Sequence, residues 1–88
     1  MSTLTINNSE SAVLGKRPGA EEFLQLGMLY STGRTMPPDM VSAHKWFNIA
    51  AVNGSREAAI LRHEIAAEMS ESEIAAAQRA ARMWMTRH

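Results

Sequence analysis

Apolar residues recur at helical spacing from Ala20 to the end of the chain, and no segment alternates with the period of two that a half-buried strand requires. Phe23, Leu26, Gly27 and Tyr30 fall at positions i, i+3, i+4 and i+7, which places them on one face of a helix. Three further apolar stripes follow at the same spacing. The pattern therefore predicts an all-α chain of four helices.

Stop and start signals separate these stripes. Gly33 and the proline pair after it end the first helix, because paired prolines cannot continue a helix. Asp39 predicts the N-cap of a second helix, since its carboxylate can accept from free backbone N–H groups. Asn53-Gly54 ends that helix, with Gly54 just past its C-terminus. The apolar stripe of the second helix consists of Met40, Ala43, Phe47, Ala50 and Ala51.

Two serines open the remaining helices. Ser55 can cap a third helix, and Ser70 with Glu73 fits the capping box, in which each side chain satisfies a free backbone N–H. The inward residues of the third helix are expected to be Ala58, Leu61, Ile65 and Met69. Those of the fourth are expected to be Ile74, Ala77, Ala81 and Trp84.

The chain of 88 residues is long enough for one domain. Residues 1–19 show no sustained period and predict a flexible N-terminal tail. Residues 20–88 predict a helical domain, in which residues 20–54 form one helix pair and residues 55–88 form a C-terminal helix pair that caps it.

Composition excludes several classes of function. Nine basic and nine acidic residues give a formal net charge of zero, which argues against nucleic acid or an anionic membrane as the main partner. The absence of cysteine excludes disulfides, thiol catalysis and thiolate metal sites. No apolar run approaches the ~20 residues of a membrane span, and the N-terminus lacks the regions of a secretion signal. We therefore expect a cytoplasmic protein.

Candidate catalytic and metal-binding patterns are incomplete. Asp39 is the only aspartate, and the N-cap role explains it. His63-Glu64 resembles the start of the H-E-x-x-H zinc motif, but Ala67 stands where the second histidine belongs. His44 lies beside the inward stripe and is predicted to be a packed or partly exposed side chain. No glycine-rich phosphate loop or nucleophile elbow occurs. We expect a non-catalytic protein with no cofactor and no metal.

Two motifs of the first helix pair resemble a known repeat. The tetratricopeptide signature W-x-x-L-G-x-x-Y has the spacing found from Phe23 onward, and its A-x-x-x-F has the spacing found from Ala43 onward. The connection from Tyr30 to Ala43 is longer than in an ordinary tetratricopeptide unit. When this loop is included, the chain resembles, without a gap, the Sel-one-like repeat, a tetratricopeptide-related family. Thr35 departs from the pattern, which has a second loop glycine there. The residues that carry the motifs are Phe23, Leu26, Gly27, Leu29, Tyr30, Gly33, Asp39, Ala43, Trp46, Phe47, Ala50, Ala51, Gly54 and Ala58.

The resemblance implies antiparallel helix pairs stacked as a short α-solenoid, with residues 20–54 as the Sel-one-like repeat. It implies a function of holding other proteins, because such repeats serve as adaptors in bacterial signalling and in the assembly of complexes. One repeat cannot bury its faces alone, so a self-associating homodimer is a second hypothesis. A small helical DNA-binding regulator is a less favoured third, because five Arg and five Glu cancel over residues 55–88.

The predicted partner-binding face lies on the first helix, about 100° from the inward stripe. Leu24 and Met28 are predicted to be its apolar contacts, and Glu21 and Thr32 its polar rim. An apolar pair beside polar groups suits recognition of a protein segment. Two alternatives remain: the N-terminal segment covers the pair, or the two are scattered surface apolar residues.

Not every large apolar residue fits an inward stripe. Met83-Trp84-Met85 cannot all point inward on one helix, so at least one must face solvent, the tail or another subunit. Trp46 lies about 100° from Phe47 around the second helix and is expected to pack against the third helix.

Overall fold

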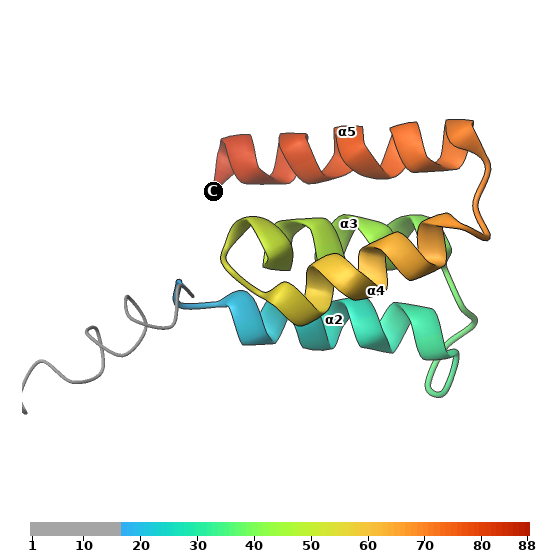
Figure 1. Ribbon diagram of the computed structural model, residues 1–88, viewed down its shortest axis with the longest axis horizontal. Coiled ribbons are helices and arrows are strands. Elements are labelled where there is room, and N and C mark those ends of the chain that lie inside the picture. The colour runs from blue at the N-terminus through green and yellow to red at the C-terminus, as the bar shows by residue number, and fades with distance from the viewer. Residues whose placement is uncertain (1–16) are drawn as a thin grey trace, which may run out of the picture.

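A computed structural model describes residues 17–88, which form four α-helices and no strand (Figure 1). The prediction of an all-α fold with four helices is confirmed for this part of the chain, and the first helix begins at Ala20 as expected. Most of the predicted tail, residues 1–16, lies outside the described residues. The helices are α2 (Ala20–Thr32), α3 (Met40–Val52), α4 (Arg56–Ala66) and α5 (Glu71–Arg87).

The last three helices begin at the caps that the sequence predicts. Asp39 caps α3 by accepting the backbone N–H of Ser42 at 3.0 Å. Ser55 caps α4 in the same way, by accepting the N–H three residues further on at 3.1 Å. Ser70 and Glu73 form the capping box of α5, with donor–acceptor distances of 3.1 and 2.8 Å. Each bond satisfies an N–H group that would otherwise have no partner in the helix.

The helices end at glycines or tight turns. Gly33 (φ 71°) ends α2 and Gly54 (φ 104°) follows α3, both in the left-handed region that favours glycine. The third helix, α4, is shorter than its apolar stripe predicts: it ends at Ala66, whereas the stripe extends to Met69. The next three N–H groups bond to carbonyls three residues back, which tightens the chain into a turn before Ser70 caps α5.

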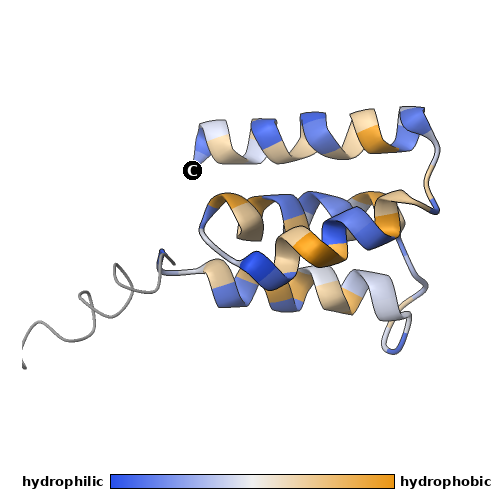
Figure 2. Ribbon diagram, viewed as in Figure 1, coloured by the Kyte–Doolittle hydropathy of each residue, from blue (hydrophilic) through white to orange (hydrophobic). Residues whose placement is uncertain are grey.

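The central helix of the fold is α3. Figure 1 shows α2 and α5 on opposite sides of α3, with α4 in front of it. α3 packs on all three other helices, whereas α4 and α5 pack on α3 instead of on each other. α3 is also rich in hydrophobic residues, while α5 carries many hydrophilic ones (Figure 2). The two C-terminal helices therefore cover the first pair separately.

The core forms where α2, α3 and α4 meet. A Cβ placed on Gly27 would overlap the ring of Phe47, so α2 and α3 approach closely at this glycine. Small residues are typical of a site where two helix backbones come together. The buried side chains of the cluster are Leu24, Ala43, Phe47, Ala50 and Ala58.

Three aromatic rings join α2, α3 and α5. Phe23 stacks on Trp46 with the ring centroids 5.9 Å apart, and Trp84 meets these two rings edge-on at 5.2 and 5.4 Å. His88 stacks on Trp84 at 4.3 Å. The expectation that Trp46 packs against the third helix is therefore wrong. Its ring lies against α2 and α5 instead, because α5 runs beside α3 and brings Trp84 to it.

Candidate partner-binding surface

Leu24 is a core residue and cannot contact a partner. Its side chain is 2 % exposed and belongs to the cluster that contains Phe47 and Ala58. The prediction of an exposed Leu24 followed from packing α2 on α3 alone. Because α4 also lies against α2, the buried arc of α2 is wider than one stripe and includes Leu24. The exposure predicted for this residue is therefore wrong.

The other three predicted contact residues differ in their surroundings. Met28 is half-buried and packs against the core cluster, while Glu21 and Thr32 are exposed. Met28 and Thr32 line one shallow groove together. Glu21 does not line this groove, but it lies one helical turn before Gln25, which does line it. The structure thus brings together two of the four residues that the sequence predicts.

We call this groove the α2 surface. Its helical members fall at i, i+3, i+4 and i+7, which is one outward stripe of α2. The Oγ1 atom of Thr32 accepts the backbone N–H of Arg34 at 3.5 Å, so the loop after α2 lies beside the helix end. The residues that line the α2 surface are Gln25, Met28, Leu29, Thr32 and Arg34.

Leu29 is the apolar contact that sequence reasoning missed. Its side chain is 41 % exposed, although the repeat motif includes it among the structural residues. The signal that could have found it is the outward stripe of Gln25, Met28, Leu29 and Thr32, which has helical spacing of its own. An exposed aliphatic side chain bordered by amide, hydroxyl and guanidinium groups can bind an amphipathic protein segment.

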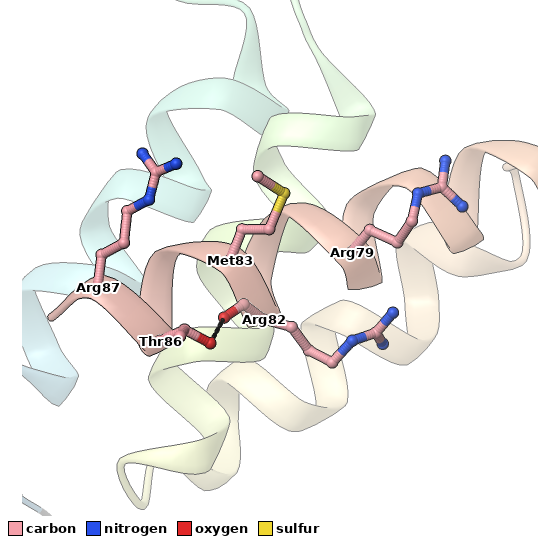
Figure 3. A pocket seen from close by; sticks show the side chains of 5 residues that line it. All are labelled: Arg79, Arg82, Met83, Thr86 and Arg87. Carbon is pink, nitrogen blue, oxygen red and sulfur yellow. Dashed lines mark hydrogen bonds between the residues drawn. The ribbon is translucent and has the colours of Figure 1, made fainter.

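A second surface lies on the outer side of α5 (Figure 3). All of its residues are exposed and come from one helix, so they form a convex face and not an enclosed cavity. Met83 is 58 % exposed, whereas Trp84 and Met85 are half-buried. The prediction that Met83-Trp84-Met85 cannot all face inward is confirmed. The residues of this outer face are Arg79, Arg82, Met83, Thr86 and Arg87.

His44 is packed inside the fold, as the sequence predicts. Its side chain is 3 % exposed, and Nδ1 has no hydrogen-bond partner among the described residues. Burial lowers the pKa of the imidazole, and the nearby Arg62 guanidinium lowers it further. The Nη1 atom of Arg62 donates to Asn48 Oδ1 at 2.7 Å, which holds this cation in place. The arrangement keeps His44 neutral at physiological pH.

Within residues 17–88, no three His, Asp or Glu side chains lie where they could hold a metal ion together. None of the helices in this range has the length and apolar composition needed to cross a membrane. The chain matches no protein-family model, no curated protein and no solved structure. The candidate functional residues are those of the α2 surface and the outer face of α5.

Proposed function

We propose that this protein is a non-catalytic interaction module of the Sel-one-like, tetratricopeptide-related type, which binds a segment of another protein on the α2 surface. The observation that carries the proposal is the exposed Leu29 beside Met28, bordered by Gln25, Thr32 and Arg34. An apolar contact within a polar rim is the arrangement that protein interfaces use at their centre. The corrected surface replaces Leu24 with Leu29.

The packing of the first helix pair supports the repeat type. Gly27 lies against Phe47, and Ala43 is fully buried, as expected where a helical repeat brings its two helices together. Gly33 ends α2 and Asp39 caps α3, which are the two loop positions that match the repeat. In this proposal α4 is the first helix of the following unit, and α5 closes a short α-solenoid.

The proposal is tested by placing the same charge on two different helices. Leu29→Glu puts a carboxylate into the α2 surface. Ile60→Glu puts one on α4, where Ile60 is 59 % exposed and does not line the α2 surface. Both variants should fold, because neither side chain belongs to the buried cluster. Circular dichroism and urea titration check that the full-length variants keep the wild-type fold and stability.

Binding is measured with purified partners. Proteins retained by the wild-type chain from extracts of the source cells are identified, purified and titrated against each variant. Leu29→Glu should weaken the specific partner by about tenfold or more, and Ile60→Glu should leave its affinity unchanged. A partner that binds the wild type and Leu29→Glu with equal affinity overturns the assignment of the α2 surface.

A further inference from the structure

A groove runs between α3 and α5, on the side of α5 that carries Met83. Ala80 and Trp84 are half-buried, whereas Arg87 and His88 are exposed. Apolar side chains therefore form its base, and basic side chains border it. The residues that line this α3–α5 groove are Lys45 of α3 and Ala80, Met83, Trp84, Arg87 and His88 at the end of the chain.

The α3–α5 groove is lined by basic side chains, and no acidic side chain lines it. Arg79 and Arg87 lie one helical turn on either side of Met83, and Figure 3 shows the three side chains along one ridge. The Nζ atom of Lys45 lies 4.5 Å from the centroid of the Trp46 ring, a cation–π contact that holds the ammonium group beside the helix pair.

These cations are available to a ligand. Lys45, Arg79 and Arg87 form no ion pair with any other residue that the structure describes. The sequence from Ile74 to His88 contains three arginines and no acidic residue. The acidic side chains of α5 lie in its first turn, at the opposite end of the helix. The C-terminal half of α5 therefore presents unpaired guanidinium groups around one exposed apolar side chain.

We propose that the ridge of Arg79, Met83 and Arg87, which borders the α3–α5 groove, binds an acidic segment of a partner protein. One apolar side chain of that segment contacts Met83, and carboxylates on either side of it pair with Arg79 and Arg87. Because the two arginines are eight residues apart on one helix, their stems lie about 12 Å apart. Two carboxylates eight residues apart on a partner helix, with an apolar residue midway, have the same spacing. Guanidinium–carboxylate pairing then fixes the register of the segment.

Charge distribution favours an acidic protein segment over nucleic acid. The chain has no net charge to attract a polyanion from a distance. A long polyanion lying along α5 would also meet Glu71 and Glu73 in the first turn. An anionic membrane fits less well, because Met83 is the single large apolar side chain exposed on the described part of this face.

The size of the surface argues against a second copy of the chain. The face of α5 is about 25 Å long and about 10 Å wide. That footprint is well below the ~800 Å² that each partner of a stable complex of standard size buries. A short segment held by charge is matched to such an area. This inference does not depend on the α2 surface, which lies on another helix.

The experiment uses a fluorescein-labelled helical peptide of alanine and glutamine, with Glu, Leu and Glu at positions i, i+4 and i+8. Fluorescence anisotropy is measured with the full chain at low and high salt. The wild type should bind at low salt and lose affinity at high salt. Arg79→Gln/Arg87→Gln should weaken binding about fivefold or more. Met83→Ala should weaken it without removing the salt dependence.

A matched control separates local from overall charge. Arg34→Gln/Arg56→Gln removes the same charge from exposed residues outside the groove and should leave the affinity unchanged. Leu29→Glu should also bind the peptide as the wild type does, so the two surfaces are tested separately. A peptide with Gln in place of both Glu residues should not bind.

Four results would overturn the proposal. One is that the wild type shows no saturable binding of the peptide at low salt. Another is that Arg79→Gln/Arg87→Gln and Arg34→Gln/Arg56→Gln lose affinity for the peptide equally. A third is that duplex DNA or phosphatidylserine vesicles bind more tightly than the peptide, and that Arg79→Gln/Arg87→Gln abolishes this binding. That result would assign the surface to a polyanion. The fourth is a concentration-dependent mass in analytical ultracentrifugation that the same substitutions abolish, which assigns it to a second copy.

Discussion

The Cα atom of Gly27 in α2 lies so close to the ring of Phe47 in α3 that a Cβ at position 27 would overlap the ring. Gly27 is buried, and Phe47 is 1 % exposed. The ring has no open space to move into, because it belongs to the cluster that contains Leu24 and Ala50. The position of α2 on α3, and with it the α2 surface, depends on this contact.

Gly27→Leu should therefore overpack the crossing and lower the free energy of unfolding by about 1–3 kcal/mol or more. Gln25→Leu places the same side chain on the exposed side of the same helix and should change stability by less than about 0.5 kcal/mol. Urea unfolding followed by circular dichroism measures both. A Gly27→Leu variant as stable as the wild type would contradict the close approach of the two helices.

Features that depend on neighbouring residues were the ones that the sequence could predict. Asp39 and Ser70 cap their helices through groups three residues away, so a short stretch of sequence contains the whole interaction. The burial of Leu24 and the partners of Trp46 depend instead on where α4 and α5 dock. A period within one helix shows which side is apolar, but it does not show how many helices cover that side.

The same distinction applies to the candidate sites. Met28 and Thr32 lie on one helix, and their spacing alone places them together. Lys45 and Arg87 come from different helices, α3 and α5, and become neighbours only because the chain reverses twice between them. No periodic pattern encodes that approach, and the balanced charge of residues 55–88 hides the basic half of α5.

His44 should make the stability of the fold depend on pH. Burial lowers the folded-state pKa of its imidazole below the ordinary value of 6.5. Between these two pKa values the unfolded chain binds a proton that the folded chain excludes. The free energy of unfolding should therefore fall as the pH decreases below 6.5, by at most about 1.4 kcal/mol per pH unit. This loss stops once the pH has passed the folded-state pKa.

Urea titrations over a series of pH values measure this effect. His44→Leu should remove the slope, whereas His63→Leu, which replaces an exposed histidine, should keep it. The capping carboxylate of Asp39 has a separate window, because its pKa is lowered from 3.8 by the backbone and side-chain hydrogen bonds of Ser42. Its contribution is lost only as the pH falls below 3.8. An unchanged slope in His44→Leu would contradict the assignment to this residue.

Trp84 should hold the C-terminal half of α5 on the rest of the fold. Its ring contacts Phe23 of α2 and Trp46 of α3, whereas the fully buried residues of α5, Ala77 and Ala81, are small. Trp84→Ala should therefore cost about 2 kcal/mol or more, and Trp84→Phe much less, because a smaller ring can keep an edge-on contact. Met83→Ala removes a neighbouring exposed side chain and should have little effect.

Hydrogen exchange locates the effect of Trp84→Ala within the chain. Amides of α5 should exchange faster than in the wild type, while those of α2 and α3 should lose less protection, because the α2–α3 crossing is intact. The exciton coupling between the two indole rings, which are 5.4 Å apart, should disappear from the circular dichroism spectrum. If α5 kept its wild-type protection without this ring, its alanine face alone would suffice to hold it on α3, and the α3–α5 groove would not depend on the aromatic cluster.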